Sequence, residues 1–160
     1  MDTKREFILE TERLIIYPLT DDEMRALIDA QENPDLKQAY TQMLQGCLLH
    51  PEARIWNAIW VFELRESAGT AVGDMSFKGL GDDGTVEIGY GTRPGYCNKG
   101  YMTEAVKRIT QWALSQEGVT RVEAETAPDN IASQKVLAKA GFIPNGQMGE
   151  EGPRFVYVGG

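Results

Sequence analysis

The sequence predicts a mixed α/β domain in which one mixed, twisted β-sheet is flanked by helices. Three observations lead to this fold class. Hydrophobic periodicity and turn residues indicate a strand, two helices and three consecutive strands in the first half of the chain. The second half follows the order helix, strand, helix and two strands, and its helical crossovers imply a locally parallel region. The length of 160 residues suits a single domain, 1–160.

The first strand is expected at 11–19, where β-branched and apolar residues end beside a proline. A helix should follow at 20–30, because Thr20 and Glu23 have the spacing of a capping box. A second helix is expected after Pro34. Its apolar stripe would comprise Leu36, Tyr40, Met43 and Cys47.

Strands are then expected at 55–66, 71–80 and 85–92, with turns at 67–70 and 81–84. In the last of these strands, alternation places Glu87, Gly89 and Gly91 on one face. Two glycines on that face leave room for a ligand against the backbone. Two alternatives stay open: the glycines pack beneath a helix, or Gly91 marks a bulge that reverses the alternation beyond it.

The following helix is expected to run to about Gly118, and the next strand to cover 120–127. A second helix in this half has clear ends, because Asp129 or Asn130 can cap its start and Gly141 can take a left-handed conformation at its end. The final strands are expected at 142–148 and 154–158.

Composition narrows the class of protein. Hydrophobic residues form 42% of the chain and charged residues 25%, the balance of a folded soluble domain. The net charge of −8 argues against a nucleic-acid partner, and apolar runs are too short to span a membrane. Cys47, Cys97 and His50 have no metal-ligand spacing, so no metal is expected, and His50 should lie at a helix end. Acidic residues near the amino terminus suggest a cytoplasmic protein rather than an exported one.

Residues 93–110 combine turn residues with four Lys/Arg side chains against one Glu. The cations are Arg93, Lys99, Lys107 and Arg108. A helix start offers unpaired N–H groups and a partial positive charge, which suits an anion such as phosphate. The alternative is an ordinary solvated helix start. Neither the dinucleotide-binding glycine motif nor the P-loop fits this segment.

The segments VEIGYGTRPGYCNKGYMTEAV, APDNIASQKVLAKAGF and LETERLIIYPLTDDE together resemble the GNAT N-acetyltransferase superfamily. The segment LETERLIIYPLTDDE is similar to the start of one branch, which includes the ribosomal-protein alanine and serine N-acetyltransferases. The resemblance implies the GNAT fold, in which two parallel strands splay apart to form an acetyl-CoA site. The cofactor-binding residues that it implies are Ile88, Tyr90, Gly91, Thr92, Cys97, Asn98, Lys99, Gly100, Tyr101, Met102 and Asn130.

This chain departs from the family pattern at several positions. In the pyrophosphate loop only Gly100 falls on the pattern. Cys97 replaces the usual Arg or Gln, which removes a charge-assisted contact, while Asn98 stands where the branch often has Gly and Met102 where a small residue is common. Leu137 occupies the position of the Tyr with which many members stabilise the departing thiolate.

The resemblance implies acetyl transfer to a primary amine by direct attack in a ternary complex. Glu87 is the candidate base, and its alternative is a surface or salt-bridged carboxylate. Backbone N–H groups of Ile88 or Tyr90 are candidate oxyanion donors. Ser133 is the candidate donor to the thiolate, and its alternative is a serine that bonds the backbone at a helix start.

A second class of function stays open, namely a catalytically degenerate acyl-CoA-binding or regulatory module of the same fold. Cys97, Met102 and the missing Tyr favour that alternative. The acceptor could be a small-molecule amine or a protein N-terminal amine, and the sequence does not decide between them. It allows a monomer or a homodimer, in which strands near the carboxyl terminus would pair.

Overall fold

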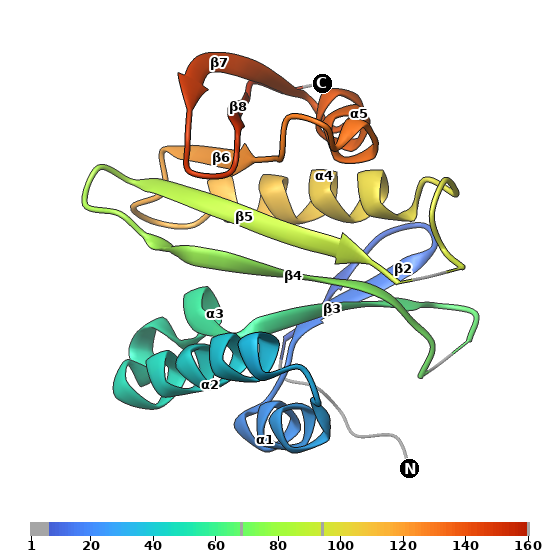
Figure 1. Cartoon of the computed structure of the whole chain (residues 1–160), viewed down its shortest axis with the longest axis vertical. Helices are drawn as coiled ribbons and strands as arrows, with labels where there is room; N and C mark the ends of the chain where they lie inside the picture. Colours follow the sequence, from blue (N-terminus) through green and yellow to red (C-terminus); the bar gives the residue numbers. More distant parts are fainter. Residues whose placement is uncertain (1–6, 68, 94, 160) are drawn as a thin grey trace.

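The computed structural model describes residues 7–67, 69–93 and 95–159, and these form one sheet of eight strands with helices packed on it (Figure 1). Residues 1–6, part of the basis for expecting no export, lie outside this description, as do Ala68 in one expected turn and Pro94 in the loop after residue 93. The strands are β1 (Leu9–Glu10), β2 (Leu14–Pro18), β3 (Ile59–Leu64), β4 (Ala71–Leu80), β5 (Thr85–Thr92), β6 (Arg121–Glu125), β7 (Phe142–Met148) and β8 (Pro153–Tyr157). The helices are α1 (Asp21–Ala30), α2 (Pro34–Leu49), the 3-10 turn η1 (Pro51–Ala53), α3 (Arg54–Asn57), α4 (Tyr101–Leu114) and α5 (Ile131–Ala140).

The order of the strands across the sheet is β1-β2-β3-β4-β5-β6-β8-β7, which confirms the mixed α/β class. Strands β5 and β6 are parallel neighbours joined through α4, as the first helical crossover requires. The second crossover, through α5, gives no further parallel pair, because β8 lies between β6 and β7 and is antiparallel to both. Pro144 lies in β7, the edge strand at this end of the sheet, where a missing N–H is tolerated.

Each face of the sheet carries its own apolar cluster. Alternation in β3 sends Trp60 and Phe62 to the side on which α4 packs, here called the α4 face. Ile59 and Val61 point to the opposite side, the α2 face, where they pack with residues of α1 and α2. In Figure 1, α1 and α2 lie below β3, and α4 and α5 lie above it.

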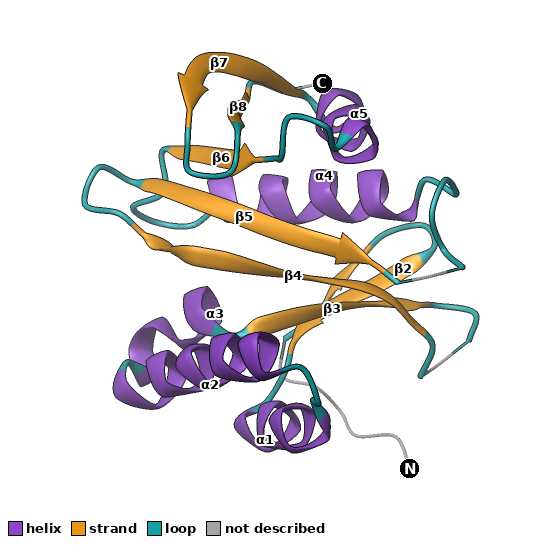
Figure 2. Cartoon of the chain, viewed as in Figure 1, coloured by secondary structure: helices purple, strands orange, loops and turns teal. Residues whose placement is uncertain are grey.

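The expectation of a continuous strand over 55–66 is wrong at its beginning. Residues Arg54–Asn57 form α3, and β3 begins only at Ile59 (Figure 2). Tertiary packing decides this, because the Trp56 ring lies 4.9 Å from that of Phe77 and 5.4 Å from that of Trp112. Strand β1 and the turn η1 also carry no local signal strong enough to predict.

The helix ends agree better with the sequence-based predictions than the start of β3 does. Thr20 and Glu23 form the expected reciprocal capping box at α1, and His50 is the carboxyl-terminal cap of α2. Helix α4 ends at Leu114, before the expected Gly118, which takes a left-handed conformation in the turn that follows. At α5, Asn130 rather than Asp129 provides the cap.

Candidate functional site

A cavity of about 490 Å³ opens between the end of β5, the start of α4 and one side of α5. Most of the residues that the sequence singled out lie on its wall. These are Tyr90, Gly91, Thr92, Cys97, Asn98, Gly100, Tyr101, Met102, Asn130 and Ser133. Glu87, Ile88 and Lys99 do not line it. Ile88 points into the core with 1% exposure, so only its main chain is available to a ligand.

The loop before α4 is shaped by three residues with left-handed backbone. Gly95, Asn98 and Gly100 have φ values of 91°, 61° and 82°. Asparagine tolerates this conformation better than other side chains, so Asn98 keeps the turn although it replaces the family's glycine. The turn before α4 therefore uses left-handed backbone at two glycines and at Asn98.

A residue that the sequence analysis missed holds this loop in place. The Arg13 guanidinium bonds Glu104 at 2.7 Å and the Lys99 carbonyl at 2.9 Å, and it stacks on the Tyr101 ring at 4.4 Å. Glu104 also accepts hydrogen bonds from the Thr11 hydroxyl and the Arg13 backbone N–H. Burial opposes ionisation of Glu104, but these bonds outweigh it and lower its pKa. The first turn of α4 is thus fixed to the start of β2.

The cations around the cavity differ from those expected. Arg93, Lys99, Lys107 and Arg108 are absent from its wall. The positive side chains that do line it are Lys135 and Lys139, one helical turn apart on the exposed side of α5. Their spacing was visible in the sequence, but the rotation of α5 that turns them to the cavity depends on packing against α4 and β7.

Strands β5 and β6 separate at the cavity. Their parallel register runs from Thr85↔Arg121 to Ile88↔Ala124 and ends there, whereas β5 continues to Thr92. Both alternatives for the glycines of β5 are wrong. The pairing of Gly91 with Asp74 shows no register shift, and a Cβ atom at Gly91 would meet nothing within 4 Å. The splay therefore has an open backbone on its α2 face.

Two hydroxyl groups, one from β5 and one from α5, form a hydrogen bond at the cavity. The Tyr90 hydroxyl lies 2.8 Å from the Ser133 hydroxyl and 3.2 Å from the Ser133 carbonyl. Burial raises the pKa of Tyr90 to about 12, with the Ser133 bond acting in the opposite sense, so the phenol stays protonated at neutral pH. The Ser133 hydroxyl forms its hydrogen bond with Tyr90, while the Asn130 side chain accepts the Ser133 backbone N–H at 3.1 Å.

Leu137 cannot reach the cavity. Its side chain is fully buried in the main core, at 0% exposure. A tyrosine at this position would require repacking of that core, so a hydroxyl here would not reach the cavity without a rearrangement. Tyr90 is the hydroxyl that sequence analysis missed as a side chain, since its partner lies 43 residues further along the chain.

Glu87 lies on the α2 face, in a network of charged side chains. Its carboxylate bonds Lys78 at 3.0 Å and Arg154 at 3.1 Å. Arg154 also bonds Glu123 at 2.8 Å and Glu125 at 2.7 Å. Glu87 is thus salt-bridged, which was the alternative to its catalytic role, but it retains 19% side-chain exposure at the level where β5 and β6 part.

The ion pairs and hydrogen bonds of this network change the pKa values of Arg154 and Glu125. Burial opposes the charge of Arg154, but its bonds to Glu123, Glu125 and Glu87 together raise its pKa. The Glu151 backbone N–H, followed by Arg154, lowers the pKa of Glu125. These contacts therefore favour the ionised form of Glu125.

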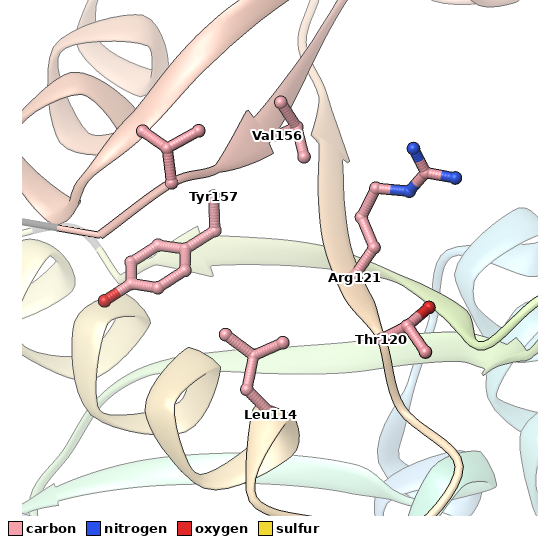
Figure 3. Close-up of a pocket in the computed structure, with 6 residues that line it drawn as sticks. Leu114, Thr120, Arg121, Val156 and Tyr157 are labelled. Carbon is pink, nitrogen blue, oxygen red and sulfur yellow. The ribbon is translucent and has the colours of Figure 1, made fainter.

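Two other hollows contain none of the candidate cofactor-binding residues. One, of about 390 Å³, lies beside the end of α4, and Figure 3 shows Leu114 below Tyr157 at its wall. The other, of about 530 Å³, lies at the opposite end of β5 and β6 from the splay and is lined by polar side chains. Within the described ranges, no cluster of side chains could hold a metal ion, and no helix is long and apolar enough to cross a membrane.

Comparison with protein families gives a match to the Acetyltransferase (GNAT) domain over residues 13–143. Among curated relatives, the uncharacterized N-acetyltransferase YjdG of Bacillus subtilis is 44% identical over 54% of this chain, which spans 52% of that protein. The uncharacterized N-acetyltransferase YoaA of the same organism is 28% identical, and the alignment covers 88% of this chain and 85% of YoaA.

Solved structures share the fold. The ribosomal L7/L12 alpha-N-protein acetyltransferase RimL, determined in complex with coenzyme A, superposes with a TM-score of 0.72. The alignment covers 94% of this chain and 96% of RimL at 16% identity, so the likeness concerns the fold alone.

Proposed function

The chain belongs to the GNAT acetyltransferase family, and from this premise we propose that it transfers an acetyl group from acetyl-CoA to a primary amine by direct attack. The single observation that supports the proposal most strongly is the cavity at the splay of β5 and β6. It joins a helix start, a left-handed glycine turn and a hydroxyl pair in one place. Acetyl-CoA would supply the activated acetyl thioester.

The residues of the cavity suit acetyl-CoA. The loop ending at Gly100 turns N–H groups at the start of α4 toward an anion, and α4 adds its partial positive charge. Lys135 and Lys139 would supply the charge that Cys97 cannot, while Asn130 and the open edge of β5 would bind the amide-bearing arm. These cavity contacts support the proposed cofactor.

Binding is tested at Gly100. Acetyl-CoA should raise the melting temperature of the wild-type protein, because it binds the folded state. We expect Gly100→Val to abolish most of that rise, since φ is +82° there and the added Cβ would lie 3.2 Å from the Arg13 guanidinium. The shift is measured by calorimetry with and without acetyl-CoA.

The matched control is Gly146→Val, which has a φ of +83° and open space around its Cβ position. It imposes the same backbone strain far from the cavity, so its ligand-induced shift should stay intact. An undiminished shift in Gly100→Val would remove the helix start from the binding site.

For the proton transfers, we assign Ser133 and Glu87 as donor and base. Ser133 would donate a hydrogen bond to the departing thiolate, and Tyr90, which stays protonated, would donate one to Ser133 and so orient its hydroxyl. The thiolate would then take its proton from solvent. Glu87, which contacts Lys78 and Arg154, would take the amine proton, directly or through water. Backbone N–H groups at Ile88 or Tyr90 would stabilise the oxyanion.

The donor assignment is tested by Ser133→Ala. We expect kcat to fall roughly 10²-fold while the affinity for acetyl-CoA is unchanged, because the bond forms mainly in the transition state. Tyr90→Phe should lower kcat less, and the double variant should be no slower than Ser133→Ala. Ser67→Ala removes one hydroxyl of a similar 2.8 Å pair with Thr70, far from the cavity, and should leave kcat intact. A normal kcat in Ser133→Ala would end its catalytic assignment.

Thiol release with a panel of amines distinguishes turnover from the alternative of a degenerate acyl-CoA-binding module. Binding of acetyl-CoA without turnover of any amine would favour the module. We propose a primary amine of a small molecule or of a protein amino terminus as acceptor, in a cytoplasmic protein that is a monomer or a homodimer. Edge strand β7, with Ile143 49% and Met148 71% exposed, is the surface on which a homodimer would form.

A further inference from the structure

One carboxylate on the α2 face stands apart from the charge network. Asp74, in β4, makes no hydrogen bond or ion pair with any described residue. Its side chain is half-buried, and burial raises its pKa, although the charge of Arg93 acts in the opposite direction. By contrast, Glu87, Glu123 and Glu125 are each engaged by Arg154. Asp74 is therefore a carboxylate whose hydrogen-bonding capacity is unused.

The strand register places Asp74 beside open space. It pairs with Gly91 of β5, and its neighbour on the same face, Ser76, pairs with Gly89. A Cβ atom at Gly91 would meet nothing within 4 Å, and one at Gly89 only the end of Lys78, at 3.9 Å. These two pairs form a strip with side chains along β4 only, here called the glycine strip.

The other groups that act electrostatically near Asp74 are Tyr40 of α2 and Arg93, which follows β5. Burial raises the pKa of Tyr40, the Asp74 charge raises it further and Arg93 lowers it. Near the glycine strip there are thus a carboxylate without a hydrogen bond to a described residue (Asp74), a phenol (Tyr40) and a cation (Arg93).

The strip begins where the proposed reaction would take place. Strands β5 and β6 part after Ile88, so an acyl group held in the splay would meet its acceptor near Gly89. Gly91 lies two residues further along the same face, a distance of about 7 Å along a β-strand. Asp74 is level with Gly91, so it lies too far along the strip to bind the reacting nitrogen itself.

We propose that Asp74 binds a second cationic group of the acceptor, so that the substrate class is a primary amine with another ammonium group about 7 Å from the reacting nitrogen. This inference rests on the proposed acetyl transfer and names its substrate class. A cation in the glycine strip would satisfy a partly desolvated carboxylate that has no hydrogen-bond partner among the described residues.

The test compares three acceptors with the same four-carbon chain: α,ω-diaminobutane, butylamine and γ-aminobutyrate. With the wild-type protein we expect kcat/KM to be at least roughly tenfold higher for the diamine than for butylamine, and lowest for the carboxylate. Asp74→Asn should remove the preference for the diamine through KM while leaving butylamine turnover and the acetyl-CoA melting shift unchanged. Asp29→Asn, an exposed aspartate of α1, should keep the preference.

The comparison of acceptors uses the wild-type protein, so it tests the inference even if the Asp74→Asn variant does not fold. Equal kcat/KM for diamine and butylamine, or a diamine preference that survives in Asp74→Asn, would overturn it. A preference for γ-aminobutyrate would assign the strip to Arg93 and overturn it as well. Turnover of a peptide amino terminus but of no alkylamine would overturn it while the proposed function stands. Absence of turnover with every amine would contradict both.

Discussion

Replacing Arg154 with methionine should lower the free energy of unfolding by about 3–5 kcal/mol, the range for removing one partner of a buried ion pair. Arg154 is 19% exposed and contacts three carboxylates whose side-chain exposures are 19%, 10% and 6%. Methionine keeps most of the volume, so the loss reports charge and hydrogen bonding rather than a cavity. The loss of hydrogen bonding should be most costly at Glu125, the least exposed of the three carboxylates, which would keep the bond from the Glu151 backbone N–H at 2.7 Å.

Urea denaturation of three variants checks this result. Arg25→Met removes an exposed pair with Asp22, whose partners are 51% and 95% exposed, and should cost less than about 1 kcal/mol. Arg154→Lys keeps the charge without the guanidinium fork and should be intermediate, which gives a measurable value even if Arg154→Met does not fold. Equal losses in Arg154→Met and Arg25→Met would contradict the structural role of the network.

The parts of the fold that the sequence predicts well are those decided by local chemistry. The capping box at Thr20, the asparagine cap of α5 and the left-handed Gly141 each depend on atoms within a few residues. The alternation of Gly89 and Gly91 likewise needs only the period of a strand. Such features can be predicted from the sequence before any tertiary contact is known.

The parts that the sequence does not predict depend on distant contacts. Trp56 belongs to a short helix because its ring packs on Trp112 of α4, and the apolar pattern of residues 55–57 suits a strand equally well. Dependence on distant contacts also explains why the sequence does not predict three groups of the candidate site. These are the Arg13 anchor, the Tyr90–Ser133 pair and the lysines of α5. Their partners lie on other elements, so the motif predicts where the cavity lies but not which side chains complete it.

The unpaired state of Asp74 is a further example. An extra residue in β4, Val72, shifts the register against β3, because Phe62 pairs with Gly73 while Glu63 pairs with Ala71. This bulge sets which β4 side chains face α2 beyond it, and simple alternation from Ala71 would give the opposite face. No local sequence pattern predicts this register shift between β3 and β4.

Replacing Glu87 with glutamine should lower kcat/KM by roughly 10²-fold near neutral pH, the scale of a general base. The substitution keeps the shape of the side chain but removes the proton acceptor beside the splay. The loss should narrow at high pH, where more of the free amine is already deprotonated. Steady-state kinetics across a pH series, with the acetyl-CoA melting shift measured alongside, provide the test.

Glu123→Gln is the matched control for Glu87, because the two residues are register partners on adjacent strands and share Arg154. Both variants weaken the same network, so both should lose stability, but Glu123 has 10% side-chain exposure and lies on the strand that ends at the splay. We expect both variants to have a lower free energy of unfolding, but only Glu87→Gln to have a lower kcat/KM under conditions where both proteins are folded. Equal kinetic losses in the two variants would assign Glu87 to the network alone, and wild-type activity with an unchanged pH profile in Glu87→Gln would exclude it as the base.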